Sequence, residues 1–257
     1  MQERYIGDCH DYVKYALLWH LKECGFKLGI NWYLADTEGV GDKGKGDGQN
    51  RHYLKDKHAP KWRRLNPTLF AKMKKLQGDE KSLEDICAHG ILPKGTHEFK
   101  EHVCGVKKDG SFCRRKWHAE ALETLKPADL IFLDPDNGLE VKSMTNKKRP
   151  KYVHTGLFSR RDRTCNEIQG YLKKGKIVVC IQFRRQGIKL DEQIRNQYRK
   201  LIEDGCVGKS LPVIGRGRVG GTGHIMFYSF APSKNHAKMA KVLSAFAKSS
   251  KGLLGTH

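Results

Sequence analysis

Two uninterrupted apolar runs constrain the fold of this chain more than any other feature. They are "DLIFLD" at 129–134 and "KIVVCIQF" at 176–183, and neither alternates with polar residues. Such runs are typical of strands that are covered on both faces, as in parallel sheets flanked by helices. Helical patterns follow them at 163–174 and 191–205. The sequence therefore predicts an α/β fold with a mostly parallel, doubly wound sheet.

The two ends of the chain complete this predicted architecture. Near the N-terminus, we expect a helix over 11–24, which begins with Asp11 as its cap and ends at Gly25, and then a buried strand over 30–35. Near the C-terminus, two strand-like runs are joined by "GGTG", which predicts an antiparallel hairpin. A last helix carries apolar residues at helical spacing, namely Met239, Val242, Leu243 and Phe246.

Residues 50–95 have the pattern of a helical insert. "PTLFAKMKKL" places an apolar stripe on one side of a helix, and Ser82 with Asp85 three residues later resembles a capping box. A chain of 257 residues is long enough to bury a sizeable core. We therefore expect one domain over 1–257, with the helical insert inside it.

The charge of the chain favours a polyanionic partner. There are 49 Lys and Arg residues against 28 Asp and Glu, which gives a net charge of +21. Each phosphate that such a surface neutralises releases counterions, so we expect the partner to be RNA or DNA; a charged coat that serves solubility is the alternative. The basic segment 142–163, which has aromatic residues interleaved, and the arginines after 183 supply the predicted nucleic-acid contacts: Lys147, Lys148, Arg149, Tyr152, Arg160, Arg161, Arg184 and Arg185.

The sequence predicts a cytoplasmic protein with no membrane segment. No apolar run approaches the ~18 residues of a membrane-spanning helix, and the polar N-terminus lacks the apolar core of a signal peptide. None of the eight cysteines forms a C-x-x-C pair, which favours thiols over a disulfide framework or a structural metal site.

Polar residues follow the first predicted strand and the strand at 130–133. The first is followed by Asp36-Thr37-Glu38-Gly39-Val40-Gly41, and the second by Asp134-Pro135-Asp136-Asn137. Parallel strands end at the same edge of a sheet, where ligands bind, so we expect both segments to face one site. The Asp134 carboxylate suits an exocyclic amine as a hydrogen-bond acceptor. A flexible glycine loop and an Asx-type turn are the alternative readings of these two segments.

These segments resemble the bacterial adenine-N6 methyltransferases that act on large-subunit ribosomal RNA. Residues 5–41 match the start of that family through Gly7, Asp8, Asp11, Val13 and Lys14, and then through Asp36, Thr37, Gly39 and Gly41. The D-P-P-Y motif of the family is met by Asp134-Pro135-Asp136-Asn137, and the family also has a helical insert after its first strand.

The resemblance implies a Rossmann-like methyltransferase fold with S-adenosylmethionine as cofactor. It assigns the cofactor pocket to Lys14, Tyr15, Asp36, Thr37, Gly39 and Gly41, and catalysis to Asp134 and Asn137, with Asp134 accepting a hydrogen bond from the target amine. The chain departs from the family where Asp136 and Asn137 replace a proline and an aromatic residue, and where Tyr15 replaces a histidine. A flipped base must then stack elsewhere, or the acceptor is not an adenine.

The predicted function is S-adenosylmethionine-dependent methyl transfer to a base amine of RNA or DNA. Two alternatives stay open. Glu140 and Lys142, which follow Asp136, resemble part of a metal-dependent nuclease core. The loss of the motif's aromatic residue is also compatible with a non-catalytic nucleic-acid-binding protein on a degenerate methyltransferase fold. The sequence specifies no oligomeric state.

Overall fold

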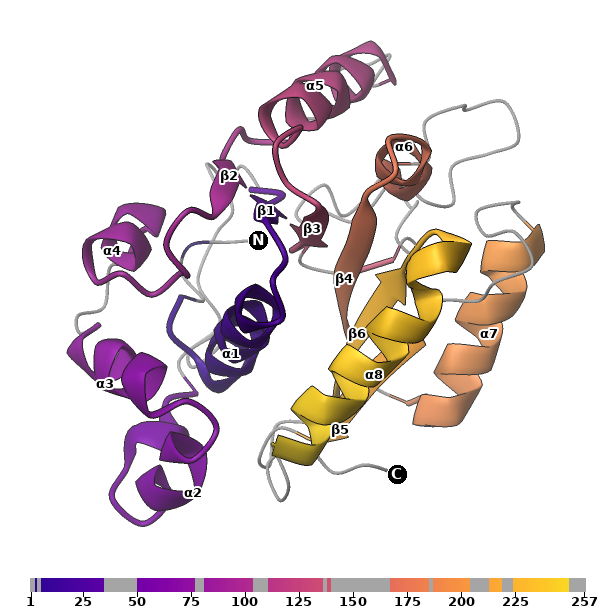
Figure 1. The fold of residues 1–257 in the computed structure, drawn as a ribbon. Coiled ribbons are helices and arrows are strands. Elements are labelled where there is room, and N and C mark those ends of the chain that lie inside the picture. The colour runs from indigo at the N-terminus through magenta and orange to yellow at the C-terminus, as the bar shows by residue number, and fades with distance from the viewer. Residues whose placement is uncertain are drawn as a thin grey trace.

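A computed structural model gives the fold of the chain (Figure 1). It describes residues 3, 6–34, 50–76, 81–103, 111–135, 138–139, 167–184, 187–203, 213–218 and 224–249. The strands in these ranges are β1 (Leu28–Asn31), β2 (His97–Phe99), β3 (Leu130–Leu133), β4 (Ile177–Phe183), β5 (Val213–Arg218) and β6 (His224–Phe230).

The described strands form a six-stranded mixed sheet in the order β2-β1-β3-β4-β6-β5. The pairs β1–β2, β1–β3 and β3–β4 are parallel, whereas β6 runs antiparallel to β4 and to β5. The predicted α/β class, the mostly parallel strands and the antiparallel C-terminal hairpin are therefore confirmed. The hairpin does not simply extend the sheet in chain order, because β6 lies between β4 and β5.

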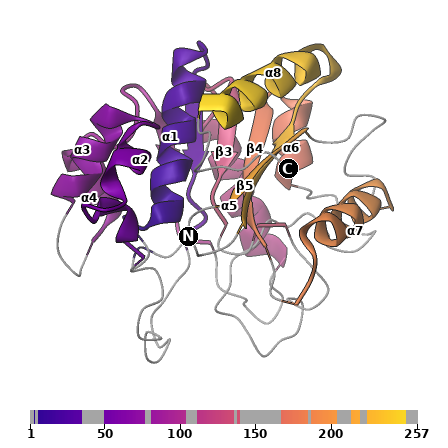
Figure 2. The ribbon, with the colours of Figure 1, turned by 90° about the horizontal axis from the view of Figure 1, so that it is seen from below.

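Helices cover both faces of the sheet (Figures 1 and 2). One face packs against α1 (Cys9–Glu23) and α8 (Ser233–Ser249), and the other against α5 (Ser111–Thr124), α6 (Glu167–Lys173) and α7 (Leu190–Glu203). Successive residues of β3 enter opposite cores: Leu130 and Phe132 join the first, and Ile131 and Leu133 the second. Burial on both sides explains why β3 and β4 have no polar alternation.

The segment between β1 and β2 holds the helical elements expected there. They are η2 (His52–Leu54), α2 (Ala59–Arg63), α3 (Pro67–Lys75) and α4 (Leu83–Ala88). The predicted stripe on α3 is buried, and the predicted capping box of Ser82 and Asp85 begins α4. Tyr12 of α1 anchors this segment, since its ring stacks on Tyr53 at 5.2 Å and its hydroxyl donates to the Trp62 carbonyl at 2.9 Å.

Two predicted element boundaries near the N-terminus are wrong. The first helix begins at Cys9, because Asp8 rather than Asp11 is its cap: Asp8 Oδ1 accepts from the backbone N–H groups of His10 and Asp11, each at 2.8 Å. The first strand ends at Asn31 instead of residue 35. Asn31 Oδ1 accepts from Tyr33 N, and Tyr33 has a positive φ of 49°, so the extended backbone is broken there.

A third boundary differs as well. The helix expected from Trp117 begins six residues earlier, at Ser111. In the described ranges no helix is long and apolar enough to cross a membrane.

Candidate active site

The candidate site lies where β1 and β3 end side by side. From β1 the chain continues to β2 on one side of it, and later returns to place β3 on its other side. Ligands of open α/β sheets bind beyond the carboxyl ends of the strands at such a reversal of strand order. Leu133 is opposite Asn31 in the register, and the next residue, Asp134, donates its backbone N–H to the Asn31 carbonyl at 3.0 Å. Asp134 therefore stands at this reversal.

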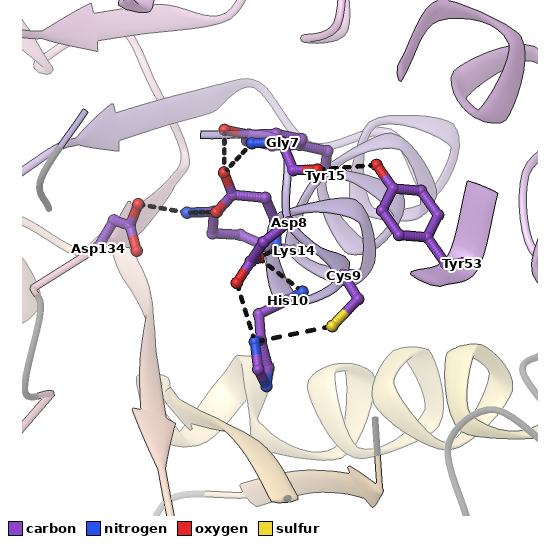
Figure 3. Close-up of polar contacts among 9 residues, drawn as sticks. Gly7, Asp8, Cys9, His10, Lys14, Tyr15, Tyr53 and Asp134 are labelled. Atoms are coloured by element: carbon purple, nitrogen blue, oxygen red, sulfur yellow. Dashed lines mark hydrogen bonds and ion pairs between the residues drawn. The ribbon is translucent and has the colours of Figure 1, made fainter. Parts of the chain in front are cut away.

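A buried ion-pair cluster occupies this position (Figure 3). Lys14 Nζ lies 2.7 Å from Asp11 Oδ1 and 2.6 Å from Asp134 Oδ2. The three side chains are almost fully buried, with 4–8 % of each exposed. Burial would lower the pKa of Lys14, but the two carboxylates outweigh burial and raise it. Two carboxylates against one ammonium leave the cluster with one net negative charge when all three groups are ionised.

Asp11 serves to hold Lys14 in place. Its second oxygen, Oδ2, accepts from Gly7 N at 2.9 Å and from the Tyr15 hydroxyl at 3.3 Å. Burial raises the pKa of Asp11 to about 6, although the attraction of Lys14 opposes this shift. Both oxygens of Asp11 are thus engaged by the protein itself, and its role in the cluster is one of positioning.

Asp134 differs from Asp11 because only one of its oxygens is held. Oδ2 accepts from Lys14, whereas Oδ1 accepts no hydrogen bond from any described residue. The carboxylate is thereby fixed in orientation, with Oδ1 left to accept a hydrogen bond from a ligand.

The turn after β3 is fixed against β4. Gly138 N donates to the Pro135 carbonyl at 3.2 Å, and Leu139 N donates to Gln182 Oε1 at 2.8 Å. Gly138 has φ +64°, and a Cβ there would lie 2.4 Å from Gln182 Oε1, so this position requires glycine. A backbone turn therefore follows the strand, as one of the two readings of the motif expected, and the placement of Asp134 at a functional site stays a prediction.

A second polar network supports the end of β1 from the other face of the sheet. Tyr33 donates its hydroxyl to Glu167 Oε2 at 2.7 Å, and Arg114 Nε lies 2.6 Å from Glu167 Oε1. Asn31 Nδ2 donates to the Tyr171 hydroxyl at 3.1 Å. Burial would raise the pKa of Glu167, but Arg114 outweighs burial and lowers it to about 2. The residues that follow β1 are therefore held by α5 and α6.

The structure brings some of the predicted site residues together. Lys14 contacts Asp134 across 120 residues of sequence. Tyr15 is fully buried and contacts the cluster twice: its hydroxyl donates to Asp11, and Lys14 Nζ lies 5.3 Å from the centre of its ring. Arg184 is exposed just past the carboxyl end of β4, four residues beyond Cys180, the partner of Leu133 at the end of β3, and its Nε donates to the Ile188 carbonyl at 3.1 Å.

The other predicted site residues lie outside the described ranges. They are Asp36, Thr37, Gly39, Gly41, Asn137, Lys147, Lys148, Arg149, Tyr152, Arg160, Arg161 and Arg185. Sequence reasoning missed the role of Asp11 in the cluster and missed the whole network of Glu167. The spacing of Asp11 and Lys14, three residues apart on a helix, was a usable signal for their pairing.

Metal-ligating groups show no clustering in the part of the chain that the structure describes. No three His, Cys, Asp or Glu side chains gather there in a way that could hold a metal ion. The cysteines whose side chains are described, Cys9, Cys24, Cys87 and Cys180, are thiols and not halves of a disulfide.

The site is thus defined by Asp134, its partner Lys14 and the positioning residue Asp11, at the carboxyl edge of β1 and β3. Comparisons of the chain with protein-family models, with curated proteins and with solved structures found no match.

Proposed function

We propose that this protein is an S-adenosylmethionine-dependent methyltransferase that acts on an amine of a nucleic-acid base. One observation carries the proposal: Asp134 stands at the reversal of strand order between β1 and β3, with Oδ2 held by Lys14 and Oδ1 without a described partner. The mostly parallel sheet with a reversed C-terminal strand supports a Rossmann-like methyltransferase arrangement.

The charge of the described cluster fits S-adenosylmethionine, a methyl donor with a positively charged sulfur. The cluster carries one net negative charge when its three groups are ionised, which suits a positively charged sulfonium. Lys14 would support the pocket through the two carboxylates that it holds, and the predicted residues after β1 would complete it. When bound, S-adenosylmethionine supplies a methyl group on a positively charged sulfur, an electrophile that needs no acid catalysis.

Asp134 has the main task on the substrate side. Its Oδ1 accepts a hydrogen bond from the target amine and so orients the nitrogen lone pair toward the methyl group. Positive charge would grow on the nitrogen as the new N–C bond forms and the methyl–sulfur bond breaks, and the fixed Asp134 carboxylate would stabilise that charge until the nitrogen releases its proton to solvent. Lys14 and Asp11 keep the carboxylate oriented, so no reorganisation is needed during the reaction.

Asp134→Asn tests this assignment. The side chain keeps its shape, and its oxygen can still accept from Lys14, so the fold and the binding of S-adenosylhomocysteine should persist. We expect methyl transfer to fall by about 10²-fold or more, the scale of losing one electrostatic contact in a transition state. The measurement is transfer of a labelled methyl group to total cellular nucleic acid, followed by nucleoside analysis.

Asp129→Asn is the matched control, since Asp129 lies just before the opposite end of β3 and is exposed. It should retain full activity. Full activity of Asp134→Asn would refute the role of Asp134. If S-adenosylhomocysteine fails to raise the melting temperature and no methyl group is transferred, the proposal is wrong; metal-dependent strand cleavage would then favour the nuclease, and salt-sensitive binding alone the non-catalytic protein.

A further inference from the structure

The helical segment between β1 and β2 carries a dense positive charge. Residues 50–76 contain nine Lys and Arg residues, and Asp56 is the only acidic residue among them. Two of the nine are used internally: Arg51 Nη2 donates to the Met73 carbonyl at 3.3 Å, and Lys72 Nζ to the Gly90 carbonyl at 2.6 Å. The others are exposed and are called the insert surface below: Lys55, Lys57, Lys61, Arg63, Arg64, Lys74 and Lys75.

The insert surface is fixed beside the candidate site. Tyr53 donates its hydroxyl to the Gly7 carbonyl at 3.0 Å, and Gly7 N in turn donates to Asp11 of the cluster (Figure 3). The Trp62 carbonyl accepts from Tyr12, which is two residues before Lys14 on α1. The basic helices are therefore bonded to the same end of α1 that holds Lys14 against Asp134.

The insert surface lacks the apolar centre that a protein interface has. Its large apolar side chains, Trp62, Leu69, Phe70 and Met73, point into the core. Among the described residues, Ile202 is the large hydrophobic residue with an exposed side chain, and it belongs to α7 and not to the insert surface. Protein partners are held by a buried apolar core, and membrane-surface helices by an apolar face. A phosphate backbone needs only cations and hydrogen-bond donors.

We propose that the insert surface binds the phosphate backbone of a nucleic acid. These contacts are additional to those expected at 142–163. If the protein is the proposed methyltransferase, the bound strand also places one of its bases at Asp134, and only this part of the proposal rests on the proposed function. Backbone binding carries no sequence information, and it fixes the register and orientation of the strand relative to the site.

Two triple variants with equal loss of charge test this proposal. Lys61→Gln, Arg64→Gln and Lys74→Gln remove three exposed charges from the insert surface. The control, Lys234→Gln, Lys241→Gln and Lys248→Gln, removes three exposed charges from α8, which packs on the opposite half of α1 through the contact of His20 with Val242. Both variants have a net charge of +18, which is three less than +21. All six side chains are exposed, so both variants should fold.

The probe is a fluorescently labelled oligonucleotide of mixed sequence, single-stranded RNA in one arm and DNA in the other, titrated at several salt concentrations. The insert variant should bind at least about tenfold more weakly at low salt. Its slope of log affinity against log salt should be shallower by about 2, because each lost phosphate contact on a single strand removes ~0.7. The α8 control should stay within about twofold of the unmodified protein.

Several outcomes would overturn the proposal. They are equal losses in the two variants, an insert variant that binds like the unmodified protein, and binding of polyglutamate at the insert surface as tight as that of the oligonucleotide. The proposed function can fail separately: if the unmodified protein binds through the insert surface but transfers no methyl group, methyl transfer is contradicted and the insert surface is supported.

Discussion

His10 is a titrating residue at the edge of the candidate site. Its Nδ1 lies 3.2 Å from Asp8 Oδ2, and its ring packs edge-on against Phe183. Burial would lower the pKa of His10, but the hydrogen bonds and charges of Asp8 and Cys9 outweigh burial and raise it from 6.5 to about 10. A group whose pKa is raised by folding stabilises the fold below its unfolded pKa, and loses that contribution as the pH passes its folded pKa.

We therefore predict that the free energy of unfolding falls between pH 6.5 and about 10, and that His10→Gln removes part of this fall. The difference between the two proteins should be roughly 1.5–3 kcal/mol at neutral pH, the range for a hydrogen bond to a charged group, and should vanish at high pH. Urea unfolding at a series of pH values measures it. Parallel curves for the two proteins would show that His10 does not titrate in this way.

Alanine substitutions at Gly138 and Gly175 distinguish the cost of backbone strain from the cost of overpacking. Both have positive φ, +64° and +74°, but a Cβ at Gly138 would meet Gln182 at 2.4 Å, whereas nothing lies within 4 Å of a Cβ at Gly175. Gly175→Ala should therefore cost only the left-handed backbone penalty of about 1–2 kcal/mol. Gly138→Ala should cost about 1–3 kcal/mol more, since it also overpacks the turn. Equal losses in urea unfolding would mean that the turn after Asp134 can shift without penalty.

At the scale of elements, one ion pair joins α5 to α6. Glu167 is buried and its pKa is lowered to about 2, while Arg114 is partly exposed. A carboxyl group with a lowered pKa stabilises the fold above its unfolded pKa, and loses that contribution as the pH falls from about 4.5 toward 2. Arg114 is thus expected to protect the protein against acid.

Arg114→Leu tests this expectation. It leaves the Glu167 carboxylate buried without its cation, so we predict a loss of about 3 kcal/mol at neutral pH and acid unfolding at a higher pH. Lys116→Leu, on the same helix, is the control: its side chain is 74 % exposed and 3.9 Å from Glu120, and such pairs contribute little. If both variants unfold at the same pH, the Arg114–Glu167 pair does not contribute to the free energy of unfolding.

Elements with strong local patterns were predictable from the sequence, and those shaped by distant contacts were not. The apolar runs gave β3 and β4, and Ser82 with Asp85 gave the start of α4. The end of β1 was misplaced because hydrogen bonds from Asn31 and Tyr33 to distant helices end the strand, and these bonds leave no trace in a local pattern.

The candidate site was predictable only in part, for the same reason. The motif at Asp134 and the chemistry of Lys14 could be proposed from the sequence, but their contact depends on the order of the strands. Asp8 and Asp11 are equally good helix caps in the sequence. Asp8 is the cap because both oxygens of Asp11 are engaged elsewhere, one by Lys14 and one by the backbone N–H of Gly7.

At the scale of the whole molecule, the described residues proposed to bind ligands lie toward one edge of the sheet. The ends of β1 and β3 lie side by side there, next to β4, and α1 connects Lys14 and the insert surface to this edge. Two hydrophobic cores, one on each face of the sheet, pack against the strands that form this edge. The proposed contacts of the insert surface with a phosphate backbone would therefore leave the packing that orients Asp134 unchanged.

The position of β6 has a consequence for truncated chains. Among the described strands β6 comes last in the sequence, yet it lies between β4 and β5 in the sheet. A nascent polypeptide that stops short of residue 224 therefore leaves one edge of the apolar strand β4 unpaired, together with the whole of β5. Exposed edges of this kind recruit other chains. A break in the chain before residue 224 should thus yield fragments that aggregate.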